Sequence, residues 1–179
     1  MPSYGQFDIW QNTAGVNRQT VLQMKYAMKS STWSATVSND TTYDVTGLSV
    51  IITPYFTSSL ILITTTLYVA SNNMYNLKYR LARNGAYPIQ GDAEGGRPRS
   101  TGYINQYTAG GYAEYGVGNV GGTHIDTPTS TSAITYSVQL GSYGSQTIYL
   151  NRSATFQNQP ASGYDNVPVS SIIVQEIAQ

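Results

Sequence analysis

The stretch that decides the fold is LILITTTLYVA, residues 60–70. It is a long apolar and β-branched run without a helical period, which is typical of a strand buried on both faces and predicts the central strand of a sheet. After a short Asn-rich turn, residues 75–83 (YNLKYRLAR) alternate with a period of two, as a half-exposed strand does. Its predicted inward residues are Tyr75, Leu77, Tyr79 and Leu81. We expect the two runs to pair as an antiparallel hairpin, with Asn84-Gly85 marking where the second strand turns away.

Alternating or apolar runs predict further strands, separated by connections rich in glycine, proline and polar residues. They cover residues 20–29, 45–53 with a bulge at Gly47, 133–140, 147–150 and 169–178, with a weaker strand carrying Trp33 and Val37 and two short strands within 103–115. Residues 84–101 and 116–131 are predicted to be loops. This pattern of about eight to ten short strands indicates an all-β fold, an antiparallel β-sandwich that is jelly-roll-like. The chain then divides into a short extended N-terminal arm, residues 1–18, and a knob, residues 19–179.

The composition describes one weakly charged domain. The 179 residues carry nine Lys+Arg and nine Asp+Glu, and only 10% of the residues are charged, well below the usual quarter. Neither a nucleic-acid patch nor a polybasic membrane surface is indicated. So neutral a surface has little repulsion to keep copies apart, and self-association is expected.

Several classes of site are excluded or disfavoured by the residue inventory. The chain has no cysteine, which excludes thiolate catalysis, Cys-ligated metals and disulfides. Residues 1–6 lack the pattern of a signal peptide, and no apolar run approaches the ~20 residues of a membrane helix. A soluble chain made without a secretion signal is therefore expected.

The single histidine, His124, lies in the run GGTHID, residues 121–126. Beside a carboxylate it could act as a general base, with Ser130 or Ser132 as nucleophile. The simpler interpretation is a solvated or locally hydrogen-bonded loop histidine. Carboxylate pairs for glycoside hydrolysis would have to come from Asp92, Glu94, Glu114, Asp126 or Asp165. No metal-binding spacing is present, so we predict no catalytic residue, cofactor or metal site and no enzyme.

Tyrosine is the unusual residue here, with 16 copies against three phenylalanines. A tyrosine ring packs while its hydroxyl bonds across a subunit boundary or to a sugar. Tyr26, Tyr75, Tyr79 and Tyr136 are explained by the sandwich core or a threefold axis. Candidates for a presented surface are Tyr112, Tyr115 and Tyr143 near glycine-rich turns, together with Asp92, Arg97 and Arg99 of the 84–101 loop. The GGRPR run of this loop could bind an anion through its backbone amides and guanidinium groups, or it could simply be a solvated loop tip.

The arm holds two isolated aromatic residues, Phe7 and Trp10. An extended arm does not keep such side chains in water, so they are expected to anchor it against its own domain, a sister subunit or another protein. We regard them as candidate partner-binding residues.

Four strand-rich stretches together suggest a family. They are DVTGLSVIITP (44–54), SSLILI (58–63), YRLARNG (79–85) and SSIIVQEIA (170–178), preceded by WQNTAGV (10–16) and QTVLQ (19–23). They resemble the head domain of many tailed-bacteriophage virion proteins, commonly labelled tail fibre or virion structural protein. The resemblance implies a homotrimeric jelly-roll-like knob at the virion surface, synthesised in the host cytoplasm. Its motifs carry no catalytic residue and do not separate roles within the family.

A full tail fibre needs a shaft, and none fits before Gln19. Two roles follow from the resemblance. One is a homotrimeric capsid decoration or cement protein that binds and stabilises the major capsid protein, which the arm with Phe7 and Trp10 favours. The other is a short tail-fibre head that docks on a tail hub or adaptor protein and binds a host-surface glycan. Neither role calls for nucleic acid or a membrane.

Overall fold

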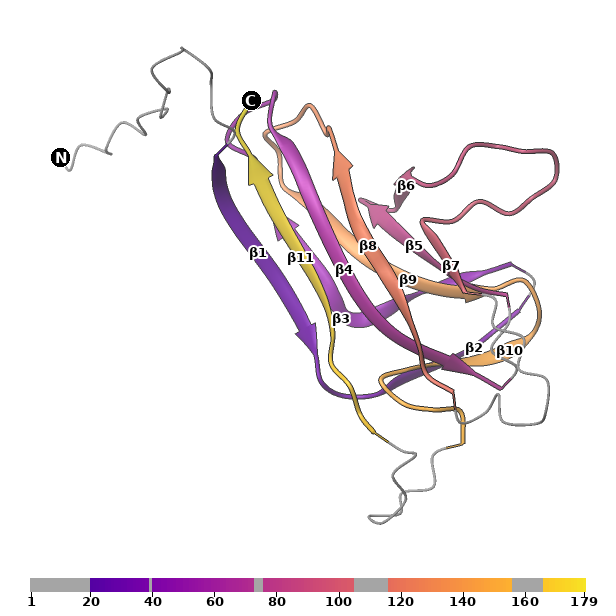
Figure 1. Cartoon of the computed structure of the whole chain (residues 1–179). Helices are drawn as coiled ribbons and strands as arrows, with labels where there is room; N and C mark the ends of the chain where they lie inside the picture. The colour runs from indigo at the N-terminus through magenta and orange to yellow at the C-terminus, as the bar shows by residue number, and fades with distance from the viewer. Residues whose placement is uncertain (1–19, 39, 73–75, 105–115, 156–165) are drawn as a thin grey trace.

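The computed structural model describes residues 20–38, 40–72, 76–104, 116–155 and 166–179 (Figure 1). All regular structure in these ranges is β-strand. The strands are β1 (Val21–Lys29), β2 (Trp33–Val37), β3 (Thr42–Ile52), β4 (Leu60–Ser71), β5 (Leu77–Arg83), β6 (Ala86–Ile89), β7 (Gly102–Ile104), β8 (Gly118–Asp126), β9 (Ile134–Ser142), β10 (Gln146–Leu150) and β11 (Ser170–Ile177). Their pairings are antiparallel. The predicted all-β antiparallel sandwich is confirmed.

Two sheets face each other across the core. The six-stranded sheet has the order β1-β11-β4-β10-β2, with β8 also paired to β4, and the five-stranded sheet has the order β3-β9-β5-β6, with β7 also paired to β5. β11 pairs with residues 60–66 of β4 and β10 with residues 69–71, while β8 pairs with residues 61–69. Strand β4 is therefore the central strand, as predicted. The facing sets β1-β11-β4-β8 and β3-β9-β5-β6 have the alternating connections of a jelly roll.

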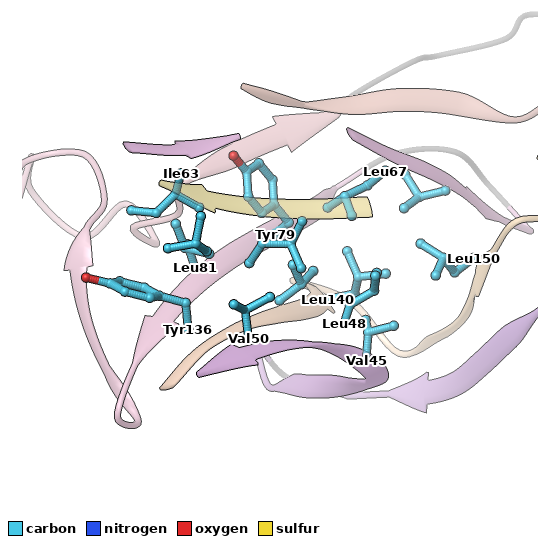
Figure 2. Close-up of a cluster of buried hydrophobic side chains, with 14 of the residues drawn as sticks. Val45, Leu48, Val50, Ile63, Leu67, Tyr79, Leu81, Tyr136, Leu140 and Leu150 are labelled. Carbon is cyan, nitrogen blue, oxygen red and sulfur yellow. The ribbon is translucent and has the colours of Figure 1, made fainter. Parts of the chain in front are cut away.

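The core consists of the inward residues of both sheets (Figure 2). From the six-stranded sheet come residues such as Ile63 and Leu67 of β4, which are fully buried. They meet Tyr79 and Leu81 of β5 and Val50 of β3 from the other sheet. The predicted inward positions of β5 that lie in the described ranges are thus buried, and burying such apolar side chains is the main force that holds the layers together.

Local sequence signals fix two backbone features. Gly47 has φ +89° at the register shift in the β3–β9 pairing, which confirms the predicted bulge. Asn84 and Gly85 have φ +50° and +82° and join β5 to β6, where Arg83 pairs with Ala86. Positive φ at both positions is what a two-residue hairpin turn requires, and Asn-Gly supplies it.

The expected hairpin between residues 60–70 and 75–83 is wrong. β4 and β5 belong to different sheets, so they pack face to face across the core instead of pairing edge to edge. Thr65 of β4 donates a hydrogen bond to the Tyr79 hydroxyl of β5 across this gap (3.4 Å). β4 is also not buried on both faces, because its alternate residues are only partly covered. The alternation of inward and outward residues is the same for two strands paired within one sheet and for two strands that face each other from different sheets. The sequence pattern therefore did not distinguish these two arrangements.

Two segments predicted to be loops contain strands. Residues 118–126 form β8, and residues 86–89 form β6. The notable case is β8, because its only inward apolar residue is Val120 and three of its nine residues are glycine. A Cβ on Gly121 would overlap the Thr65 carbonyl of β4. The glycine that made this segment resemble a loop is therefore what lets β8 lie close to β4.

Strand β1 alternates as predicted but presents its large residues outward. Met24, Tyr26 and Met28 are 53%, 64% and 64% exposed, whereas Ala27 packs against the core. Tyr26 pairs with Ile173 of β11, whose neighbours Ile172 and Val174 are the buried ones. Tyr26 therefore does not fill the sandwich.

Candidate functional site

A groove lies on the outer side of the five-stranded sheet, near the start of β5. It encloses about 470 Å³, and we call it the Lys78 groove. Its lining includes Asp40, Asn76, Lys78, Arg97, Tyr103 and Tyr143. They come from the β2–β3 connection, the start of β5, the β6–β7 loop, β7 and the β9–β10 turn. Segments distant in the chain thus converge on one surface.

Lys78 is the buried charge of this groove. Its side chain is only 4% exposed, and its ammonium donates hydrogen bonds to the Asp40 carboxylate and, at 2.9 Å, to the Asp40 carbonyl. Burial, and secondarily the positive charge of Arg80, lowers the pKa of Lys78 to about 8. The contact with Asp40 opposes this effect, because a neighbouring carboxylate favours the charged form. The Lys78 ammonium is therefore held in a fixed position and orientation by Asp40.

Two exposed tyrosines flank the buried cation. Tyr103 is 53% exposed, and its hydroxyl donates to Asn76 Oδ1 at 3.0 Å. Tyr143, in the turn after β9, is 64% exposed. Aromatic faces beside fixed polar groups form the kind of surface on which a ligand with one apolar face and several hydroxyls is held.

The residues predicted for a presented loop lie on the segment between β6 and β7, which projects from the sandwich (Figure 1). Asp92, Arg97 and Arg99 are all exposed. Arg99 donates to the Gly91 carbonyl at 2.6 Å and, through its own carbonyl, accepts from Arg80, so it closes the base of the loop. Arg97 lines the Lys78 groove and is 3.6 Å from Glu94, with both side chains 78% exposed.

The remaining predicted site residues are Tyr112, Tyr115, Phe7 and Trp10, and all four lie outside the described residues. The sequence reasoning missed Lys78 and Asp40, which are 38 residues apart and carry no recognisable motif. The alternation placed Lys78 on the solvent side of β5. It is on that side, but Asp40 covers it.

His124 is a strand residue of β8, not a loop residue as expected. Its Nε2 shares a hydrogen bond of 2.7 Å with the hydroxyl of Tyr79 on the facing sheet. Burial lowers the pKa of His124 and raises that of Tyr79, so both groups are held neutral near pH 7. The Ser130 hydroxyl accepts from the Ser132 amide at 3.1 Å. The geometry thus uses His124 to join the two sheets.

Two residues after His124 in β8, the buried carboxylate of Asp126 makes a second link between the two sheets. Asp126 is 6% exposed and accepts hydrogen bonds from Arg83 Nη1 at 2.9 Å and from the Tyr136 hydroxyl at 2.6 Å. Burial, followed by the hydrogen bond to Asp126, strongly raises the pKa of Tyr136. Both oxygens of this carboxylate accept hydrogen bonds, from the arginine and from the neutral tyrosine. We assign this cluster to fastening β8.

A second buried carboxylate lies near the end of β11. Glu176 is fully buried and accepts hydrogen bonds from the Ser59 hydroxyl, the Tyr55 amide and the Gln23 side chain, at 2.6, 2.7 and 2.6 Å. Three donors replace its lost hydration. Within the described ranges, no cluster of three or more His, Cys, Asp or Glu side chains forms a metal site, and no helix is long and apolar enough to span a membrane.

The outer face of the six-stranded sheet has a different character from any of these sites. Across β1, β11, β4 and β8 its outward residues are Val21, Met24, Tyr26 and Met28; Ser171, Ile173, Gln175 and Ile177; Leu60, Leu62, Thr64, Thr66 and Tyr68; and Asn119, Gly121, Thr123 and Ile125. None of these residues is charged. We call this surface the uncharged face.

The outer face of the five-stranded sheet provides the contrast. Its centre is Gln139, which accepts from Thr42 and Tyr87 and donates to Asp44. Arg80 lies 5.0 Å from the Tyr87 ring. One sheet therefore presents a charged, internally hydrogen-bonded face, as expected of a face in water, while the other presents apolar and threonine side chains.

Comparisons with known proteins do not assign the chain to a family. No protein-family model matches it, and no curated protein matches it significantly. Among solved structures, the Gx strain of infectious bursal disease virus matches with a TM-score of 0.37 and 13% identity, and the VP2 subviral particle of that virus with 0.35 and 10%. Each match covers 99% of this chain and 44% of the other, so the chain spans less than half of those proteins. Likeness at this level carries no functional argument.

Proposed function

We propose that the chain is a non-enzymatic virion structural protein. In this proposal it forms a homotrimer that sits on a bacteriophage capsid and stabilises the shell of the major capsid protein. The observation that carries the proposal is the uncharged face, because a chain of this size with one sheet face free of charge has a surface suited to protein contact. The strand-pattern resemblance to phage virion heads supports the same role.

The inventory of buried polar groups also supports a structural role. His124 and Asp126 each bind a tyrosine of the facing sheet, and Glu176 is surrounded by three donors. Each group is used to hold the sandwich together. A rigid sandwich of this kind suits a protein whose task is to reinforce an assembly.

The proposal is tested by particle binding. Purified chain should elute as a trimer of its 19.4 kDa subunit in light scattering, and should bind capsids assembled without it and raise their resistance to heat. Deleting residues 1–15 should abolish binding while leaving a folded trimer, since Phe7 and Trp10 are the proposed anchors. Capsids that bind neither form, or that gain no resistance, would contradict the proposal.

The Lys78 groove favours a second candidate function, that of a short tail-fibre head that binds a host-surface glycan. Two exposed tyrosines, Tyr103 and Tyr143, flank a held ammonium there. Sugar rings have an apolar face and a rim of hydroxyls, which such a groove can serve with ring faces and fixed polar groups.

This candidate is tested by binding host envelope polysaccharide to the full chain and to Tyr143→Ala. If the groove is a glycan site, Tyr143→Ala should weaken binding at least several-fold. Tyr55→Ala is the matched control, since Tyr55 is 60% exposed, is not among the residues that line the groove, and should bind normally. If Tyr143→Ala bound the polysaccharide as tightly as the Tyr55→Ala control, the groove would be excluded as the glycan site.

A further inference from the structure

The uncharged face carries two distinct apolar features, one along β1 and one that spans the neighbouring strands β11, β4 and β8. On β1, Met24, Tyr26 and Met28 form a ridge in which every residue is more than half exposed. On the β4, β8 and β11 side, Leu60, Leu62, Ile125 and Ile177 line an apolar hollow of about 220 Å³. Ile125, on the edge strand β8, is 62% exposed. A projecting side chain and a recess thus lie on the same face.

We infer that the β1 ridge of one copy packs into the apolar hollow of the next copy, with Tyr26 as the inserted side chain. The contact repeats around a threefold axis. The inference rests on the homotrimer proposed above and adds to it the surfaces that meet. The occupant of the uncharged face is thus a second copy of this chain, not the capsid protein.

The charge pattern argues for a second copy. In a ring of three identical chains, the three copies of a residue that lies close to the axis face one another, so a charged residue there meets two charges of its own sign. The uncharged face avoids this cost completely, whereas the opposite sheet carries Asp44 and Arg80 on its outer face. Residues close to the axis meet only their own copies, whereas a contact with a different protein can pair each charge with an opposite one.

The size of the face also suits a subunit contact. Four strands about 4.8 Å apart and nine residues rising about 3.3 Å each cover roughly 600 Å² as a flat rectangle. A stable contact buries about 800 Å² on each partner. Side chains make the surface larger than its flat projection, but each copy in a ring makes two contacts that share this face, so the face provides a large part of the area that a stable association needs.

The placement of the two features sets the symmetry. In the order β1-β11-β4-β8, the ridge is at one edge and the edge strand β8, which carries Ile125, is at the other. A ridge that enters a hollow joins two different surfaces, which makes a heterologous contact, and such contacts close into rings when the rotation allows. Three copies whose faces turn toward one axis place each β1 edge against a neighbouring β8 edge.

The test is a charge-swap rescue read by light scattering of the full chain. Tyr26→Lys and Ile125→Glu should each convert the trimer to monomer, because each puts an unpaired charge into an apolar contact. The double variant should recover the trimer, since the lysine of one copy meets the glutamate of the next. Ile51→Lys is the matched control: Ile51 is 63% exposed on the opposite sheet and should leave the trimer intact.

Methionine oxidation gives a second measurement that does not depend on a variant folding. Met24 and Met28 are 53% and 64% exposed in the single chain, so peroxide should oxidise them readily in a monomer. In the wild-type trimer they should be protected at least several-fold relative to the Tyr26→Lys monomer or, if that variant does not fold, to the exposed methionine of a tripeptide.

The outcomes separate the inference from the proposed function. A wild-type chain that stays monomeric at all concentrations would remove the trimer itself. A trimer that survives both single substitutions, or in which Met24 and Met28 oxidise freely, keeps the proposed function and overturns the ridge-in-hollow contact. Protection that arises only when the trimer binds capsids would assign the face to the capsid protein and overturn the inference as well.

Discussion

Replacing Asp126 with alanine tests whether its carboxylate holds β8 on the sandwich. The change removes the acceptor for the hydroxyl of Tyr136, which is fully buried, and for Arg83, whose side chain is 29% exposed. An unsatisfied buried hydroxyl costs about 1–3 kcal/mol. The lost bond to Arg83 adds about 1 kcal/mol after allowance for its access to water. We therefore expect Asp126→Ala to lower the free energy of unfolding by about 3 kcal/mol.

The assay is thermal and urea unfolding at one fixed protein concentration, so that assembly does not change the comparison. About 3 kcal/mol corresponds to a Tm decrease of about 6–12 °C for a chain of this length. Tyr136→Phe alone should cost about 1 kcal/mol, and the double variant should cost less than the sum, because the two residues share one hydrogen bond. Asp92→Ala, on the exposed loop, is the control. A cost for Asp126→Ala no larger than that control, or strictly additive effects, would refute the reasoning.

Three other positions give further predictions. Gly121→Ala should lower the free energy of unfolding in urea by about 1–3 kcal/mol, because the added Cβ would overlap the Thr65 carbonyl. Gly122→Ala should cost less, since its Cβ would lie 3.2 Å from His124 Nε2. Equal costs for the two variants would contradict the close approach of β8 to β4. Glu176→Ala removes the acceptor of three hydrogen bonds, one of them buried, and should cost more than Glu176→Gln, which keeps one acceptor. The reverse order of the urea midpoints would contradict this prediction. Because burial lowers the pKa of His124, the unfolded chain takes up the proton first as the pH falls below about 6.5. The free energy of unfolding should therefore decrease between pH 7.5 and 5.5. If the free energy of unfolding of a His124→Gln variant decreased just as steeply, His124 would be excluded as the cause.

The parts of the fold that depend on local chemistry could be predicted from the sequence. Gly47 and Asn84-Gly85 supply backbone conformations that few other residues adopt, and the structure has a bulge and a turn there. The apolar run 60–70 has no other way to bury itself than as a central strand, which β4 is. These features depend on residues a few positions apart, so the sequence states them directly.

The parts that depend on distant partners could not be predicted. β8 is a strand because β4 offers it an edge, and its own residues, with one inward apolar side chain, carry almost no strand signal. The Lys78 groove joins Asp40, Lys78 and Tyr143 through the packing of three connections. The loop around Arg97 was predicted from its glycines and charges, but its position beside Lys78 was not. Sheet membership and groove lining are properties of the folded topology.

Strand β1 shows how such a limit can itself be informative. Its alternation of Met24, Tyr26 and Met28 with polar residues reads as a strand with one buried face, and in the single chain that face is in water. An apolar stripe that the described residues of its own domain leave exposed has the character of a surface for protein contact. The core explanation for Tyr26 is therefore removed, while the threefold-axis explanation stays a prediction. In the proposed trimer this stripe would be covered by a neighbouring copy, and β1 would contribute to the assembly core instead of the domain core.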